Sequence, residues 1–391
     1  MVFSLSRDDQ LLRTMIHSPY LRLGCLLCMA VALFGCTDSQ TKSDENTDVI
    51  RVENTDTNVW EDHEKAPLQF EHEQTFGADE DPRDKILADA RGLAVDTDGT
   101  VYILDMGNHR LVAFNPDGTI RWSAGRQGEG PGEFFLPQSL VWDGDRHLYV
   151  ANQFGARIDV WNTDGTFQDS QSIDDVDRAS GLRGVVDGHL VNSSPGFGKD
   201  PAKVHLIDAQ RWALHDKIHI RAEHTFSEGI GLGFDVETDN DGFWVGNVAT
   251  YAISRYDFEG QKTHEITRTN IDFPEIEALG REEGGPSLDI RSRVQAPLRL
   301  DSGHLLVASN WQTSSDDEAE NTQEPVGFEG TYSSAVDLFN PEGMFMGRIR
   351  WDKQQIPDIG ELRSIGPDGK LYTFHSEPFP QIRRYAISIN E

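Results

Sequence analysis

The chain has 391 residues, of which 66 are acidic and 35 are basic, and its formal net charge at pH 7 is −31. Binding to phosphates needs a basic surface, so this charge sets nucleic acid aside as a partner. Hydrophobic residues make up 37% of the chain, which also holds 36 glycines. Such a composition is too apolar for general disorder and favours many short strands joined by turns.

The N-terminal segment has the pattern of an export signal. Arg13 and Arg22 precede an apolar run at 23–34, which is too short to span a bilayer and matches the apolar region of a secretory signal. The run ends in Leu-Phe-Gly-Cys at 33–36, which resembles the lipobox of bacterial lipoproteins, where the cysteine is lipidated and becomes the mature terminus. We expect a signal peptide at 1–35 and lipidation at Cys36. The alternative is an ordinary signal in which Cys36 is incidental.

Cysteine usage fits export with a lipid. Cleavage would remove Cys25 and Cys28, and acylation would consume Cys36, so that no disulfide could form in the mature chain. Residues 36–66 are expected to form an acidic, flexible tether, because they begin with a polar, acidic stretch that has no hydrophobic period. The protein is therefore expected outside the cytoplasm, anchored by its lipid to the bacterial cell membrane or outer membrane.

An internal repeat determines the expected architecture. Val-Tyr-Ile-Leu-Asp at 101–105 recurs 47 residues later as Leu-Tyr-Val-Ala-Asn, and Asp-Gly-Thr at 117–119 recurs at the same offset. Further copies, some of them weaker, bring the number of units to six. Within each unit short alternating apolar segments are separated by Asp-Gly or similar pairs, which is typical of hairpin-linked antiparallel strands.

Units of this length with four such strands indicate the blades of a β-propeller. We predict an all-β, six-bladed propeller of four-stranded antiparallel blades over residues 67–391. The last unit lacks its outer strand, and the segment at 68–76 near the mature N-terminus is a spare strand. We expect this N-terminal strand to close the ring.

The sequence also resembles a known family. The evidence is Asp-Gly-Thr-Val-Tyr-Ile-Leu-Asp at 98–105, Gly-Asn-His-Arg-Leu at 107–111, Asn-Pro-Asp-Gly at 115–118 and Gly-Pro-Gly-Glu-Phe at 130–134. These motifs resemble an NHL repeat, and the chain as a whole is similar to the six-bladed propeller lipoproteins of Bacteroidota and related phyla.

The connections divide between two faces of the expected ring. The tight turns fall on one face, and the long connections at 125–137, 193–203, 270–295 and 312–330 fall on the other, which we call the loop face. Long loops on a rigid scaffold are a usual place for binding. We therefore expect a ligand or a protein partner on the loop face.

A ring of polar residues is expected where the second strand of each blade reaches the loop face. Its members are Asp105, Asn152, Ser194, Asn247, Ser309 and His375. Asp105, Asn152 and Asn247 are candidate ligands for a metal, with calcium as the possible cofactor. The resemblance implies a structural alternative, in which Asp105 pairs with Arg110 and Asn152 with Arg157.

Arginines recur near the start of the innermost strand in four blades. They are Arg91, Arg183, Arg299 and Arg363. A guanidinium group suits carboxylate, phosphate or sulfate, so these residues, with Asp235 and His375, are candidate binding residues for a small acidic ligand at the channel mouth. The alternative is that Asp235 and neighbouring carboxylates already neutralise the arginines.

An enzyme is the second reading of the same pattern. Similar propellers include calcium-dependent lactonases and zinc-dependent amidating lyases, which would make the chain a metal-dependent hydrolase or lyase. A three-histidine zinc site is poorly supported, because only His375 falls in the polar ring and His109 in a neighbouring loop. Binding is the function that we favour.

Overall fold

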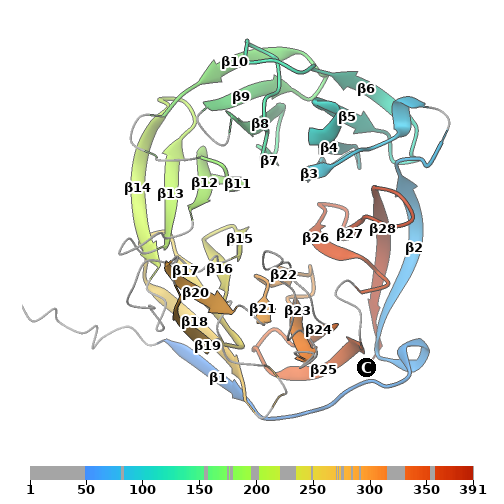
Figure 1. The fold of residues 1–391 in the computed structure, drawn as a ribbon, viewed down its shortest axis with the longest axis vertical. Helices are drawn as coiled ribbons and strands as arrows, with labels where there is room; N and C mark the ends of the chain where they lie inside the picture. Colours follow the sequence, from blue (N-terminus) through green and yellow to red (C-terminus); the bar gives the residue numbers. More distant parts are fainter. Residues whose placement is uncertain are drawn as a thin grey trace, which may run out of the picture. The chain divides into compact units, whose positions relative to one another are not determined.

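Six antiparallel sheets follow one another along the chain and surround a common axis (Figure 1). The computed structural model describes residues 49–80, 83–153, 157–173, 176, 179–194, 202–220, 235–247, 250–269, 271, 273, 277–282, 285–289, 292–314, 331–352 and 357–390. The signal peptide, Cys36 and the first part of the expected tether lie outside the described residues.

The strands of each blade run in order from the axis outwards. Blade 1 comprises β3 (Ala90–Val95), β4 (Val101–Asp105), β5 (Arg110–Phe114) and β6 (Ile120–Ala124). Blade 2 comprises β7 (Ser139–Trp142), β8 (His147–Asn152), β9 (Arg157–Asn162) and β10 (Phe167–Gln171). Blade 3 comprises β11 (Leu182–Val186), β12 (His189–Ser194), β13 (Ala202–Asp208) and β14 (Ala213–Ile220).

The other three blades include the departures from this plan. Blade 4 comprises β15 (Asp235–Asp239), β16 (Gly242–Gly246), β17 (Ala252–Asp257) and β18 (Lys262–Arg268). Blade 5 has a divided inner strand, β21 (Ser292–Val294) and β22 (Leu298–Arg299), followed by β23 (Leu305–Ser314), β24 (Thr331–Phe339) and β25 (Phe345–Trp351). Pro297 lies in the division, where it donates no hydrogen bond to the ladder. Blade 6 comprises β26 (Glu361–Ile365), β27 (Leu371–His375), β28 (Gln381–Ile389) and β2 (Leu68–Phe76).

A few short elements lie outside the blades. They are β1 (Ile50–Asn54), the hairpin of β19 (Glu277–Glu282) and β20 (Gly285–Asp289), and the 3₁₀ turns η2 (His63–Lys65), η3 (Arg83–Lys85) and η4 (Met106–Asn108). The described part of the chain contains no helix long and apolar enough to cross a membrane.

The core is divided into clusters that each join two neighbouring blades. Phe114 of β5 and Phe76 of β2 belong to one cluster, and their ring centroids are 6.0 Å apart. Leu104 of β4 packs in another cluster with Leu140 of β7. Because every blade presents apolar residues on both faces of its sheet, the blades hold one another in place without a disulfide.

The N-terminal strand closes the ring as expected. β2 pairs with β28 in antiparallel register from Leu68 opposite Ile389 to Phe76 opposite Ile382. Both ends of β2 are fully buried. The six-bladed, four-stranded architecture predicted from the repeats is thereby confirmed.

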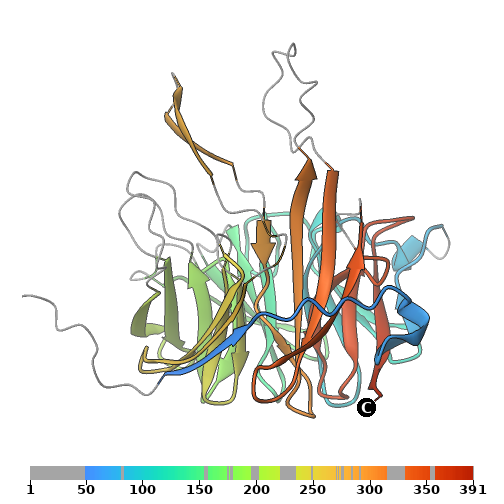
Figure 2. The same ribbon diagram turned by 90° about the horizontal axis from the view of Figure 1, so that it is seen from below.

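Residues 50–66, the second part of the expected tether, are held against the propeller and form what we call the strap. β1 extends blade 4 as a parallel partner of β18, and Val59 then forms a parallel bridge with Arg348 of blade 5. Figures 1 and 2 show the strap passing along the outside of the ring before it enters β2. The expectation of a free tether up to residue 66 is therefore wrong for this part.

A buried ionic network joins blades 4 and 5 beneath the strap. The Asp337 carboxylate lies 2.9 Å from Arg268 Nη1 and 2.6 Å from Arg348 Nε, and it also accepts a hydrogen bond from the Tyr251 hydroxyl. Arg268 in turn donates to the backbone carbonyl of Asp56 at 2.9 Å. Burial of the network is nearly complete, since Asp337 has no exposed surface and the two arginines are 4% and 5% exposed.

Tight turns and long connections separate as predicted. Seven of the expected turn glycines have a positive φ: Gly99, Gly118, Gly165, Gly260, Gly303, Gly343 and Gly369. The eighth, Gly242, instead begins β16. On the opposite side of the ring, Figure 2 shows the β19–β20 hairpin together with the ends of β23 and β24. The side that holds the tight turns is called the turn face below.

Candidate functional site

Asp105, the first member of the expected polar ring, has a structural role. Its carboxylate has no exposed surface, accepts the backbone N–H of Ala88 at 3.0 Å and of Asp89 at 3.2 Å, and lies 3.0 Å from Arg110 Nε. These contacts tie the entry of β3 to β4 and β5. The predicted pairing of Asp105 with Arg110 is present.

Asn152 is also held by hydrogen bonds, but its partners differ from the expected one. It accepts the backbone N–H of Phe135 at 3.0 Å and donates to Asp159 at 2.6 Å. Arg157 forms its ion pair with Asp159, at 2.9 Å. The expected direct pair of Asn152 and Arg157 is thus replaced by two contacts to Asp159, a residue that the repeat pattern did not single out.

The remaining ring positions differ in exposure. Asn247 and Ser194 are partly exposed, whereas Ser309 and His375 are buried. Burial, with a smaller effect of Arg383, lowers the pKa of His375 to about 4, so this imidazole is neutral at pH 7. Among the described residues no group of three or more His, Cys, Asp or Glu could hold a metal ion.

Three of the four recurring arginines share one backbone feature. In β3, β11 and β26 the register with the next strand shifts across the arginine, so Arg91, Arg183 and Arg363 each occupy a β-bulge. A bulge leaves its extra residue unpaired and can re-aim the side chain. The ion pairs are Arg91–Asp89 at 3.0 Å, Arg183–Asp235 at 3.2 Å and Arg363–Glu361 at 2.8 Å. The carboxylate pairing named as the alternative is therefore present at these three arginines.

Arg299 departs from the expected shared register. It lies directly opposite Leu305 in β22 and is exposed to solvent. The interruption of the inner strand at Pro297 moves Arg299 away from a bulge position, which repeat spacing alone does not reveal. Arg299 therefore does not share the bulge position of the other three arginines.

Blades 3 and 4 bring together a set of polar side chains, which we call the axial cluster: Arg183 of β11, Ser193 of β12, and Asp235 and Glu237 of β15. Arg183 donates from Nε to Ser193 Oγ at 2.9 Å and pairs with Asp235. Asp235 also accepts the backbone N–H of Ala296 at 3.3 Å. This contact links the cluster to blade 5.

Glu237 is the member of the axial cluster that sequence reasoning missed. It follows Asp235 by two positions in β15, and alternate residues of a strand point to the same side. Burial, reinforced by the nearby Asp235 carboxylate, raises the pKa of Glu237 to about 8 despite the opposing effect of Arg183. Glu237 is therefore mostly protonated at pH 7. In the sequence, the alternation of Asp-Val-Glu-Thr-Asp at 235–239 could have indicated that Glu237 lies on the same side of the strand as Asp235.

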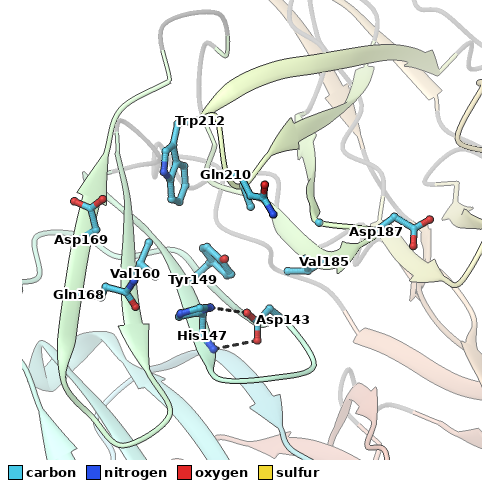
Figure 3. A pocket seen from close by; sticks show the side chains of 12 residues that line it. Asp143, His147, Tyr149, Val160, Gln168, Asp169, Val185, Asp187, Gln210 and Trp212 are labelled. Carbon is cyan, nitrogen blue, oxygen red and sulfur yellow. Dashed lines mark hydrogen bonds and ion pairs between the residues drawn. The ribbon is translucent and has the colours of Figure 1, made fainter.

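A second concavity lies between blades 2 and 3 on the turn face, and we call it the blade 2/3 pocket (Figure 3). Its volume is about 380 Å³. It is lined by Asp143, His147, Tyr149, Val160, Gln168, Asp169, Val185, Asp187, Gly188, Ala209, Gln210 and Trp212. Sequence reasoning placed all binding on the loop face and did not foresee this pocket.

Comparisons with known proteins agree with the fold. A family model described as 6-bladed beta-propeller matches residues 83–183. NHL repeat-containing protein 3 of mouse and of human is 36% and 35% identical to this chain over 75 residues, which is 18% of this chain and 22% of each relative. The match thus spans about a fifth of these curated relatives.

Two solved Bacteroides structures have the same fold. One is a member of the DUF4221 family from Bacteroides vulgatus, with 10% identity, a TM-score of 0.53, and coverage of 82% of this chain and 99% of that chain. The other is a Bacteroides fragilis protein provisionally described as exported. It has 14% identity, a TM-score of 0.53, and coverage of 88% of this chain and 100% of that chain. The resemblance to NHL-type six-bladed propellers that the repeats indicated is confirmed.

Proposed function

We propose that this NHL-like six-bladed propeller is an extracytoplasmic, lipid-anchored binding protein whose ligand is an anionic group held by the axial cluster. The observation that carries the proposal is the Arg183 guanidinium, which is 33% exposed and contacts Ser193 and Asp235 in the same cluster as Glu237, whose pKa is raised to about 8. A carboxylate, phosphate or sulfate needs donors of this kind.

The chemistry of the cluster favours an anion over a cation. Arg183 has five N–H donors, and the contacts to Ser193 and Asp235 leave others available on a side chain that is 33% exposed. A protonated Glu237, which is partly exposed, adds an O–H donor, as a carboxylic acid kept neutral can do. Asp235 is balanced by Arg183 and by the N–H of Ala296, which reduces its repulsion of an incoming anion.

Other arginines lie on inner strands as well, although Arg91 and Arg363 are paired with Asp89 and Glu361. Arg91 and Arg363 occupy bulges of inner strands, like Arg183, and Arg299 is exposed on β22. In a chain whose net charge is −31, arginines repeated on inner strands support a role in attracting an anion. An acidic small molecule, or an acidic group of a protein partner, would use the same donors.

Anchoring follows from the sequence rather than from the described residues. The basic residues, the apolar run and Cys36 resemble a lipoprotein signal, and the provisional name of the Bacteroides fragilis relative agrees with export. Cys36→Ser should remove the protein from the membrane fraction and abolish labelling with palmitate. Unchanged fractionation together with an unlipidated wild-type chain would contradict anchoring.

A thermal-shift screen tests the binding function. Inorganic phosphate, sulfate and a panel of small mono- and dicarboxylates should include at least one anion that raises the Tm of the wild-type chain. Arg183→Gln should abolish that shift, whereas Arg146→Gln, which removes an exposed arginine from the turn face, should leave it unchanged. No shift with any anion, or equal shifts in both variants, would refute the proposal.

A further inference from the structure

We propose that the blade 2/3 pocket is a second binding site, separate from the axial cluster, for a small organic cation with an ammonium or guanidinium group. The pocket opens on the turn face, whereas the axial cluster lies on β11, β12 and β15. The inference does not depend on the function proposed for the axis.

Two aromatic rings form one wall of the pocket. Tyr149 of β8 and Trp212 of the β13–β14 turn have ring centroids 6.1 Å apart and an interplanar angle of 57° (Figure 3). The His147 ring lies edge-on to Tyr149 at 6.2 Å. Aromatic rings that line a pocket can attract an organic cation through their negative faces.

The charged side chains that line the pocket are acidic, which suits a cationic ligand. Asp143, Asp169 and Asp187 contribute carboxylates, and no Lys or Arg occurs among the described residues that line the pocket. Asp143 is engaged with His147, its Oδ2 lying 2.8 Å from the ring Nδ1. Asp169 and Asp187 are exposed, so they can meet a cation as it enters. An anionic ligand would be repelled.

The Tyr149 hydroxyl supplies an independent indication of a ligand. Tyr149 is 7% exposed, and among the described residues its hydroxyl has no hydrogen-bond partner. Because Tyr149 lines the pocket and its hydroxyl is not among the fully buried polar atoms that lack a partner, the hydroxyl is open to a group that enters the pocket. An ammonium or guanidinium N–H donating to the Tyr149 oxygen would satisfy it, which a quaternary ammonium cannot do.

The pocket is built by an unusual backbone. Asp187 and Trp212 both have left-handed conformations, with φ values of 48° and 53°, and these are uncommon for residues other than glycine. Trp212 is fixed by a hydrogen bond from its N–H to the Asp208 carbonyl at 2.8 Å, and the Asp208 carboxylate accepts the N–H of Gln210 and of Arg211 at 2.9 Å. The aromatic wall is therefore preorganised.

Calorimetric titration of the full chain tests the site, with agmatine, n-butylammonium and tetramethylammonium as cations and glucose as a neutral probe. Agmatine and n-butylammonium should bind, and tetramethylammonium should bind more weakly because it cannot donate to Tyr149. A capped arginine amide has a guanidinium group but no free amine, so it distinguishes two kinds of ligand. If it binds as tightly as agmatine, the ligand is an arginine side chain of a peptide. If it binds more weakly, the ligand is a small molecule with a free amine.

Matched variants locate the binding. Tyr149→Phe keeps the ring and should weaken agmatine about ten-fold. Asp187→Asn should also weaken it, whereas Asp145→Asn, an exposed carboxylate outside the lining, should not. Arg183→Gln should leave cation binding intact, which separates this site from the axial cluster. Binding of glucose in place of the cations, or cation binding that neither Tyr149→Phe nor Asp187→Asn changes, would overturn the proposal.

Discussion

Asn54 and Phe345 are 291 residues apart in the sequence, yet Asn54 Oδ1 accepts the backbone N–H of Phe345 at 2.8 Å. The amide of Asn54 also donates to the Gly343 carbonyl at 3.1 Å, and the side chain is only 2% exposed. A single buried residue of the strap thus fastens the turn between β24 and β25.

The strap should therefore contribute to stability. Asn54→Ala would leave the Phe345 N–H and the Gly343 carbonyl buried without these partners, at a cost of ~1–3 kcal/mol in the free energy of unfolding. Asn58→Ala is the matched control, because Asn58 makes an exposed hydrogen bond to Met346 that water can replace. Urea unfolding measures both. Equal stabilities of the two variants would show that the strap is a passive tether.

The buried network around Asp337 should be sensitive to the loss of its one carboxylate. Asp337→Asn leaves Arg268 and Arg348 buried without a counter-charge, and breaking such a network costs ~3–5 kcal/mol. Asp352→Asn is a suitable control, since its exposed pair with Arg350 contributes little. Urea unfolding of both variants at pH 7 provides the comparison, and a stable Asp337→Asn chain would contradict the assigned role.

Glu237 should make stability depend on pH between about 4.5 and 8. Because burial raises its folded-state pKa above the ordinary 4.5 to about 8, the unfolded chain releases the proton first as pH rises. The favourable contribution is complete below pH ~4.5 and is lost by about pH 8, and it amounts to at most ~5 kcal/mol. Glu237→Gln should remove this dependence and be the more stable chain at pH 9. Parallel stability profiles for wild type and Glu237→Gln would exclude the raised pKa.

His375 should make the stability of the fold decrease as pH falls, at lower pH than the effect of Glu237. Its folded-state pKa of about 4 lies below the ordinary 6.5, so the unfolded chain takes up the proton first as pH falls. Stability is complete above pH 6.5 and declines as pH falls through about 4, by ~2–3 kcal/mol. His375→Gln should show a shallower decline between pH 7 and pH 4.5 in urea unfolding. A decline as steep as that of the wild type would show that His375 does not titrate in this way.

The repeats were sufficient to predict the ring, because alternation and turn glycines are local signals that recur in each blade. The closing strand at Leu68–Phe76 followed from counting strands, since the last blade lacked one. Pairing of Asp105 with Arg110 followed from the resemblance to NHL repeats. These features depend on residues that are near in sequence or on a count of similar units.

The features that escaped prediction depend on residues that meet only in the folded ring. The parallel pairing of β1 with β18 has no local pattern, because its partner lies more than 200 residues away. Tyr149 and Trp212 meet across two blades through a turn whose left-handed Trp212 no propensity suggests. The pKa of Glu237 is raised first by burial, which depends on packing that a sequence does not display.

The most direct test of the axial binding function is a calorimetric titration of the wild-type chain, at pH 6.5 and at pH 9, with the anion that gives the largest thermal shift. With a pKa of about 8, Glu237 is a donor at pH 6.5 and an ionised carboxylate that repels the anion at pH 9. Binding should therefore weaken up to about ten-fold at pH 9 in the wild type. In Glu237→Gln it should stay nearly constant, because the amide donates at both values. Equal wild-type affinities at the two pH values, or an Arg183→Gln chain that binds as tightly as the wild type, would contradict the account.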